Sequence, residues 1–301
     1  MKKNTSYLLP LLIVTFFIAP TSSTTAQSKS KQYIQEIKHW DAARLAELKG
    51  ATGWVNLAGL YWLKQGENSF GSASTNALVF KHEAFPAYLG KFILNGTEVQ
   101  WETAEGNEVT EKNKPFQSGI IFTAEPLTAL SLAFKTFRWS IIKREDLIGV
   151  RFRDLAHPAL EALKKIDRFK INEQWVLDAE FKPSLVPTIT TTNILGQSYQ
   201  QPYPGKIIFK IDGVTYSLDV VDEGKEGEYH IVFGDETNGV ETYPSGRFVD
   251  IHKPDASGRT KIDFNKAYNP PCAFSAFSTC PIPTKANTLP IAIKAGEMKV
   301  H

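Results

Sequence analysis

FILNGTEVQW, residues 92–101, carries the clearest local signal in the chain, because apolar and polar side chains alternate on both sides of one Asn-Gly pair. Alternation with a period of two is typical of a β-strand that buries one face. Asn and Gly adopt positive φ more readily than other residues, and a type I′ turn needs positive φ at both central positions. The stretch therefore predicts an antiparallel hairpin turned at Asn95-Gly96.

Many other short stretches have a strand-like pattern, and turn residues separate them. A second tight turn is expected at Asp212-Gly213, and a third lies within REDL, residues 144–147. The remaining strand candidates are NLAGLYWL (56–63), ALVF (77–80), EQWVLDAEF (173–181), TITTTNILG (188–196) and EYHIVFG (228–234). This spacing predicts an all-β fold, a mostly antiparallel sandwich or partly closed barrel.

Two peripheral helices are expected beside these strands. Apolar residues recur at helical spacing within residues 31–50, and Gly50 is placed to end that helix. A short helix is expected at PALEALKKI, residues 158–166, because proline suits the first position of a helix. We divide the chain into a signal peptide (1–26), an N-terminal helix (27–50), an N-terminal β subdomain (51–157) and a C-terminal β subdomain (158–301) that carries the polar loop motifs.

The first 26 residues have the pattern of an export signal. Lys2 and Lys3 precede a short apolar run, and small residues stand before Gln27. The run is shorter than the roughly 20 residues of a membrane helix. We therefore expect a periplasmic or secreted protein without a membrane span after cleavage. Cleavage would leave 301 − 26 = 275 residues with a formal charge of 2 − 2 = 0, which argues against a nucleic-acid partner.

Five blocks of the sequence together resemble a family of bacterial proteins known as DUF1684. These blocks are GWVNLAGLYWLKQGENSFGS (53–72), RFRDL (151–155), GDETNGVETYPSGRF (234–248), DFNKAYNPPCAFSAFSTCPIP (263–283) and NTLPIAIKAGE (287–297). The resemblance spans nearly all of the chain after residue 26. It implies no activity and no catalytic residue, because the family is uncharacterised.

A second resemblance lies within the N-terminal half. NSFGSASTNALVF, residues 68–80, is similar to the opening of forkhead-associated domains, which are β-sandwiches that bind phosphothreonine. Those domains place an arginine after the first glycine, where this chain has Ser72. Since a charged donor is what holds phosphate, the resemblance supports a sandwich rather than phosphopeptide binding.

GDETNGVETYPSGR, residues 234–247, is the densest polar stretch. Asp235, Glu241, Tyr243 and Arg247 fall within 13 positions, and Gly and Pro residues bend the chain between them. Arginine offers a planar fork to a carboxylate or phosphate, and a carboxylate acts as a base if burial raises its pKa. We interpret these four residues as a candidate ligand site. The alternative is an Arg–carboxylate pair that only holds a long loop together.

The only two cysteines lie in DFNKAYNPPCAFSAFSTCP, residues 263–281. In an exported protein two nearby cysteines usually pair, and a Cys272–Cys280 disulfide would contribute about 2.5 kcal/mol by loop entropy. We expect such a crosslink to orient Asn265, Tyr268 and Asn269. A metal pair, a nucleophilic thiol and two unpaired buried cysteines are the alternatives.

Three functions are compatible with these patterns. The first is binding of a small polar or anionic ligand in a C-terminal pocket, with Tyr243 and Tyr268 offering ring faces. The second is a hydrolase that uses a carboxylate pair from Asp235, Glu241 and Asp263, or Cys272 as nucleophile. The third is an interaction module of the cell envelope.

Cofactor and metal signatures are missing from the sequence. No G-x-S-x-G elbow, P-loop or H-E-x-x-H pair occurs, and the six histidines lack metal-ligand spacing. VDEGKEGEYH, residues 221–230, gathers four acids and a histidine, but we interpret it as the solvated tip of a hairpin. No cofactor and no metal are expected.

Overall fold

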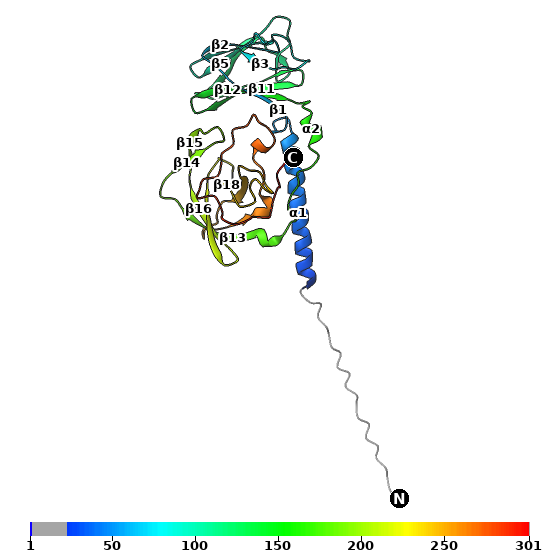
Figure 1. The fold of residues 1–301 in the computed structure, drawn as a ribbon, viewed down its shortest axis with the longest axis vertical. Helices are drawn as coiled ribbons and strands as arrows, with labels where there is room; N and C mark the ends of the chain where they lie inside the picture. Colours follow the sequence, from blue (N-terminus) through cyan, green and yellow to red (C-terminus); the bar gives the residue numbers. More distant parts are fainter. Residues whose placement is uncertain (2–22, 301) are drawn as a thin grey trace.

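The computed structural model describes Met1 and residues 23–300, and they form a long helix beside a set of mostly antiparallel sheets (Figure 1). Helix α1 (Ser23–Lys49) confirms the expected N-terminal helix, and the amide of Gly50 donates to the Glu47 carbonyl at its end. The signal-peptide prediction falls largely on residues 2–22, outside the described part. The helix itself runs through the predicted cleavage point after Ala26. No described helix is long and apolar enough to cross a membrane.

Residues 57–154 form a β-sandwich of two six-stranded sheets. The first has the order β1-β12-β11-β10-β6-β7 and the second β3-β2-β4-β5-β8-β9. Their strands are β1 (Leu57–Trp62), β2 (Gly66–Gly71), β3 (Leu78–Val79), β4 (Gly90–Asn95), β5 (Glu98–Thr103), β6 (Thr110–Glu111), β7 (Lys114–Pro115), β8 (Ser118–Thr123), β9 (Thr128–Ala129), β10 (Ser131–Phe134), β11 (Phe137–Arg144) and β12 (Leu147–Asp154). Phe70, Trp101 and Trp139 meet between the sheets, with ring centroids 5.2 to 6.4 Å apart where they contact. Aromatic packing of this kind is the main apolar contribution to the sandwich.

The two turns predicted at Asn95-Gly96 and Asp212-Gly213 differ in how well the structure agrees with them. Asp212 and Gly213 both have positive φ, +49° and +82°, between paired Ile211 and Val214, which confirms the tight turn. The hairpin of residues 92–101 also forms, but Asn95 pairs with Glu98, so its loop residues are Gly96 and Thr97. Of these only Gly96 has positive φ, which makes the expected type I′ turn at Asn95-Gly96 wrong by one residue.

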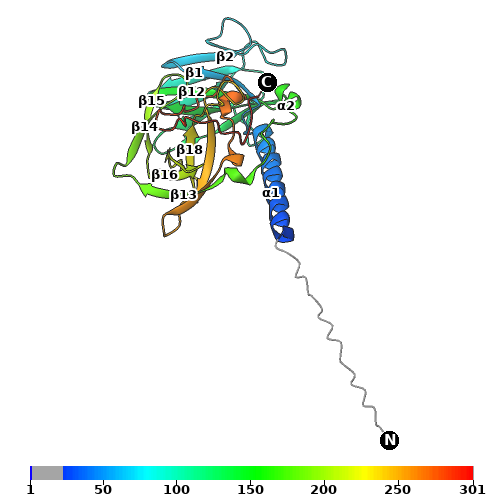
Figure 2. The same ribbon diagram turned by 60° about the horizontal axis from the view of Figure 1, so that its bottom comes forward.

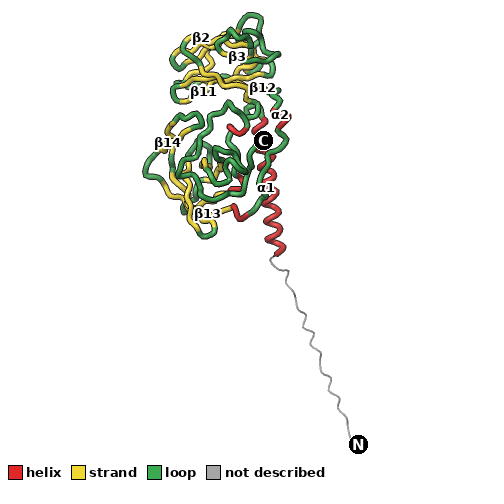
Figure 3. Tube along the Cα trace, viewed as in Figure 1, coloured by secondary structure: helices red, strands yellow, loops and turns green. Residues whose placement is uncertain are grey.

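The C-terminal half contains three smaller sheets joined by long loops, drawn green in Figure 3. A four-stranded sheet has the order β17-β16-β13-β20, and β14-β15 and β18-β19 are separate two-stranded hairpins. The strands are β13 (Val176–Pro183), β14 (Thr188–Thr192), β15 (Ser198–Pro202), β16 (Gly205–Ile211), β17 (Val214–Val220), β18 (Glu228–Phe233), β19 (Arg247–His252) and β20 (Arg259–Asp263). The short helices are α2 (Ala159–Ala162), η1 (Glu173–Trp175), η2 (Phe264–Lys266) and η3 (Pro271–Ala273).

The fold class agrees with the sequence-based prediction. Every pair of named strands in the described chain is antiparallel except β2 with β3, and none of the described sheets closes into a barrel. Two large apolar clusters form, one within residues 70–152 and one within residues 179–295, and a third, small one surrounds Phe248. The subdomain boundary at residue 157 stays a prediction.

Helix α1 packs along the C-terminal half, as the two views of Figures 1 and 2 show. Ile37 and Leu48 are fully buried on its inner face. Tyr33 donates its hydroxyl to both carboxylate oxygens of Asp263, 2.8 and 2.9 Å away, and Arg44 contacts Glu297. These contacts hold the helix against the segment that contains the cysteines.

Candidate functional site

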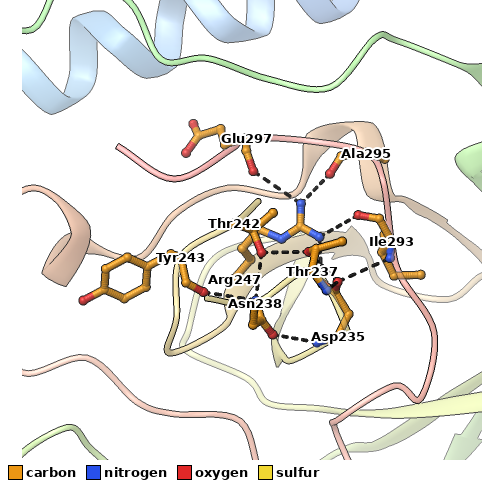
Figure 4. Close-up of polar contacts among 9 residues, drawn as sticks. All are labelled: Asp235, Thr237, Asn238, Thr242, Tyr243, Arg247, Ile293, Ala295 and Glu297. Carbon is orange, nitrogen blue, oxygen red and sulfur yellow. Dashed lines mark hydrogen bonds and ion pairs between the residues drawn. The ribbon is translucent and has the colours of Figure 1, made fainter. Parts of the chain in front are cut away.

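Arg247 lies at the start of β19 and points into the protein (Figure 4). Its side chain and that of Asp235 are fully buried, and Nη2 donates to Asp235 Oδ2 at 2.7 Å. The same nitrogen donates to the Ile293 carbonyl at 2.9 Å, and Nη1 donates to the carbonyls of Ala295 and Glu297. Burial lowers the pKa of Arg247, and the Asp235 carboxylate opposes this. Arg247 thus joins the C-terminal segment to β19. This arrangement corresponds to the alternative interpretation of residues 234–247, in which an Arg–carboxylate pair only holds a long loop together.

Asp235 completes that network. Its Oδ1 accepts hydrogen bonds from the amide of Thr237 at 2.8 Å and from its hydroxyl at 2.5 Å. Thr237 in turn shares a hydrogen bond of 2.8 Å with the hydroxyl of Thr242, and Asn238 donates to that hydroxyl at 2.9 Å. The polar density of residues 234–247 is therefore directed inward.

The other predicted ligand-binding residues are dispersed. Glu241 forms a surface ion pair with Lys294 at 3.2 Å, and burial raises the pKa of the Tyr243 hydroxyl. Asn265 is fully buried and bonds the backbone of Asn172 through both its amide nitrogen and its oxygen.

Asn269 is also fully buried and donates to the carbonyl of Met298 at 2.7 Å. Of the seven predicted residues, Tyr268 alone lines one of the two clefts described below. The structure does not bring all seven around one hollow, and ligand binding by any of them stays a prediction.

The predicted disulfide is wrong, because Cys272 and Cys280 are both free thiols. They are nevertheless neighbours: the amide of Cys272 donates to Cys280 Sγ at 3.1 Å, and the amide of Cys280 donates to Cys272 Sγ at 3.3 Å. A hydrogen bond from Cys280 lowers the pKa of Cys272 to about 6, while the same contact and burial raise the pKa of Cys280. Hydrogen bonds from backbone amides to the two sulfurs, not a covalent crosslink, hold the loop.

The outer face of the β18–β19 hairpin is the most unusual surface of this half. Ile231 and Val249 belong to the apolar core on the inner face. The outer face would normally be solvated, yet Val232 and Phe248 are buried there beneath Tyr268 and the two cysteines. A cleft lies against this face near Phe248, and another near His230.

The first cleft, of about 420 Å³, lies between the sandwich and the C-terminal half. Val150 and Phe152 face the sandwich core, so alternation along β12 directs Arg151 to the opposite side. There Arg151 Cζ lies 4.9 Å from the ring centroid of Trp54. The remaining walls come from the β11–β12 hairpin, the β14–β15 hairpin, the β17–β18 connection, β19 and the cysteine loop: Lys143, Arg144, Glu145, Asn193, Gln197, Tyr199, Glu223, Phe248, Pro271, Ser278, Thr279, Cys280 and Pro281.

Arg151 is the exceptional side chain of this cleft. It makes no hydrogen bond or ion pair with any residue of the described chain, and its Nε is buried without a partner. Burial, with the nearby Arg144 and Arg153, lowers its pKa to about 10. At neutral pH it remains a cation, since that value lies well above 7. A desolvated cation without a counter-ion is a binding element that the sequence analysis missed.

The second cleft, of about 360 Å³, lies under helix α1 and is lined by Trp40, Ala43, Arg44, Glu47, Glu223, Lys225, Glu228, Tyr229, His230, Asp250 and Tyr268. His230 Nδ1 lies 2.7 Å from Asp250 Oδ1, and the Tyr268 hydroxyl donates to both Asp250 oxygens at 3.3 Å. Burial raises the pKa of Asp250, but the hydrogen bonds and charges of His230 and Lys225 together outweigh it, and the pKa is lowered. His230 is buried, so the solvated-tip interpretation of residues 221–230 is wrong for its last residue. No cluster of three or more metal-ligating side chains occurs among the described residues.

Comparison with known proteins agrees with the resemblance seen in the sequence. A family model described as "Protein of unknown function (DUF1684)" matches residues 161–298. We call the matched residues 161–298 the DUF1684 region. This DUF1684 region supplies the β18–β19 hairpin, both cysteines and Tyr268, whereas Trp54 and Arg151 precede it.

Two solved structures are similar to parts of the chain. A solution NMR structure of an uncharacterized protein from Haloarcula marismortui matches with 22% identity and a TM-score of 0.40, covering 46% of this chain and 78% of its own. A structure titled as an analysis of phosphothreonine-dependent FHA domain interactions matches with 12% identity and a TM-score of 0.22, covering 31% of this chain and 92% of its own. No protein with a curated description matches this chain in sequence.

Proposed function

We propose that the protein binds a small organic anion in the first cleft, with its charged group on Arg151 and its ring against Trp54. The observation that carries this proposal is the unpaired, half-buried guanidinium of Arg151. Removing a charge from water costs free energy unless a counter-ion compensates. A carboxylate or phosphate would supply that compensation through two parallel hydrogen bonds.

The composition of the cleft favours this ligand class. Three cations, Lys143, Arg144 and Arg151, face two acids, Glu145 and Glu223, so the walls carry 3 − 2 = +1 formal charge. Trp54 and Tyr199 offer aromatic faces. A volume of about 420 Å³ lies in the range of small-molecule sites, roughly 300–1,000 Å³. The ligand is therefore an anion with one ring rather than a polymer.

Calorimetric titration and thermal unfolding with matched probes test this proposal. Benzoate and phenyl phosphate should bind and raise the melting temperature, whereas neutral benzamide should not. Arg151→Gln should weaken binding about 10- to 100-fold, the value of a charge-assisted hydrogen bond. Arg259→Gln, at an exposed arginine on β20, is the control. Equal affinity of wild type and Arg151→Gln, or no binding of either anion, would refute the proposal.

The geometry supports the alternatives less well. Asp235 and Glu241 are paired with different cations, and Asp263 accepts from Tyr33, so these carboxylates have separate partners. No histidine of the described chain forms a hydrogen bond to Cys272, although a thiol nucleophile needs a base within reach. For an interaction module, the most exposed apolar side chain after Met1, Leu185, lies in a loop and not on a sheet face.

We also propose that the protein is exported, on the basis of Lys2, Lys3 and the apolar run that follows. Export predicts that the mature chain begins at Gln27. N-terminal sequencing of the protein from a secreting host tests this, and recovery of an intact Met1 from the envelope fraction would contradict it.

A further inference from the structure

The cysteine loop holds two sulfur atoms in a preformed arrangement without a covalent bond. Each sulfur accepts a hydrogen bond from the backbone amide of the other cysteine, at 3.1 and 3.3 Å. Pro271 and Pro281 each adjoin one cysteine and restrict the backbone beside it. Amide donors directed at sulfur stabilise the thiolate form, which is the form that binds metals. The loop is thus built around two sulfur ligands.

The donor set restricts which ion fits. No cluster of three or more Cys, His, Asp or Glu side chains exists in the described part of the chain, so no further side chain of these four types stands beside the two sulfurs as a ligand. Structural zinc needs four ligands in a tetrahedron, and calcium and magnesium need oxygen. Soft thiolates select Cu(I), which does not require a full tetrahedron. Two sulfurs therefore fit a soft monovalent ion far better than zinc.

The charge around the pair agrees with such a site. Two thiolates and one monovalent cation have a net charge of −2 + 1 = −1. Cys280 and Arg151 line the same cleft, and a negative charge on Cys280 would raise the pKa of Arg151. The otherwise unpaired guanidinium is therefore placed to stabilise an anionic sulfur–metal centre.

We propose that Cys272 and Cys280 bind one Cu(I) ion as a two-coordinate dithiolate at the wall of the first cleft. Binding forms two Cu–S bonds and involves no change of oxidation state. The thiol protons that the two cysteines carry are released to water as the Cu–S bonds form.

The direct test is anaerobic titration of the reduced full chain with Cu(I) in competition with bicinchoninate. Wild type should remove one Cu(I) per chain from the chelator. Zn(II), offered with a chromophoric zinc chelator, should not be retained. Retention of Zn(II) instead of Cu(I), or a Cys272–Cys280 disulfide in freshly purified protein, would overturn the proposal.

Variants locate the site. Cys272→Ser and Cys280→Ser should each abolish Cu(I) transfer, while His252→Ala, at an exposed histidine, should not change it. Because Cys280 is buried, replacing it also perturbs the fold, so sulfur-only two-coordination in the X-ray absorption spectrum of the wild type is the independent measurement. Cu(I) binding that survives loss of Cys272, or a spectrum with nitrogen or oxygen ligands, would refute the site.

Arg151 separates this proposal from the proposed anion binding. Arg151→Gln should weaken Cu(I) binding about 10- to 100-fold, as loss of an outer partner of a metal ligand does, without abolishing it. Cys272→Ser should leave benzoate and phenyl phosphate binding unchanged. Cu(I) binding by a protein that binds neither anion would leave the metal site standing and remove only the proposed function.

Discussion

Arg247 and Arg151 occupy comparable positions in two antiparallel hairpins, yet their surroundings are opposite. Arg247 is on the inner face of β19, fully buried, with a carboxylate and three carbonyls as acceptors. Arg151 is on the outer face of β12, half-buried, with the ring of Trp54 beside it and no hydrogen-bond acceptor in the described chain. Both terminal nitrogens of Arg247 have acceptors, although its Nε has none, whereas the guanidinium of Arg151 has none at all.

The difference between the two arginines shows that a dense polar motif in a sequence need not be a binding site. Residues 234–247 contain both donors and acceptors, and a chain that brings them together satisfies them internally, because an unpaired buried polar group costs about 1–3 kcal/mol. RFRDL, residues 151–155, places Arg151 where no carboxylate lies within ion-pair distance in the described chain. The missing partner, rather than the polar density, indicates a binding site.

The largest expected effect is that of Arg247→Met. Removing the guanidinium leaves Asp235 and several carbonyls buried without a donor, so the free energy of unfolding should fall by about 3–5 kcal/mol. Urea denaturation followed by circular dichroism measures this, with Arg259→Met as the exposed control. A loss below about 1 kcal/mol would show that the internal pairing of Arg247 does not stabilise the fold, contrary to the comparison with Arg151.

Asp235→Asn should have the next largest effect. The amide still accepts from Thr237 but no longer neutralises Arg247, so the loss should be about 2–3 kcal/mol. In the double variant with Arg247→Met, the combined loss should be smaller than the sum by at least about 1 kcal/mol. Strict additivity in the same urea experiment would show that the two residues do not act as a pair.

The effect of replacing Asp250 should lie between those of Arg247 and Arg151, because Asp250 is paired with His230 but lines a cleft. Its pKa in the folded protein is lowered, so its contribution is present above the unfolded value of about 3.9 and is lost as pH falls through the folded pKa. Asp250→Asn should therefore be less stable than wild type at pH 6, and the gap should narrow as pH falls from 5 to 2. A gap that is constant over this range would contradict the pairing with His230.

Arg151→Met should have the smallest effect on stability. The substitution removes an unpaired, partly desolvated charge but also the contact with Trp54, so the free energy of unfolding should stay within about 1 kcal/mol of wild type. Substitution by methionine should thus destabilise the protein strongly at Arg247 and only slightly at Arg151. A loss comparable to that of Arg247→Met would show that Arg151 is structural.

Local patterns predicted much of the fold because they depend on near neighbours. Alternation around Gly96 and Gly213 indicated both hairpins, and helical spacing within residues 31–50 indicated α1. The turn at residue 96 was misplaced by one position, since the pairing of Asn95 with Glu98 is decided by the register of the whole sheet.

Most of the candidate site could not be predicted from the sequence. Alternation in FVDIH, residues 248–252, does place Phe248 and Asp250 on one face, and this signal was available. It does not show that Tyr268 and the cysteine loop cover that face. The disulfide prediction failed for a similar reason, because spacing in the chain does not specify whether two sulfurs reach bonding distance.

The sequence alone determined the β-rich class, the leading helix, the principal turns and the polar character of residues 234–247. Tertiary structure decided that Arg247 is enclosed, that the two thiols stay free, and that Trp54, Arg151 and Cys280 share one cleft. The reason is that turns and alternation depend on interactions over a few residues. The cleft of Trp54, Arg151 and Cys280 depends on segments about 100 residues apart in the chain, which only the packing of one layer on another brings together.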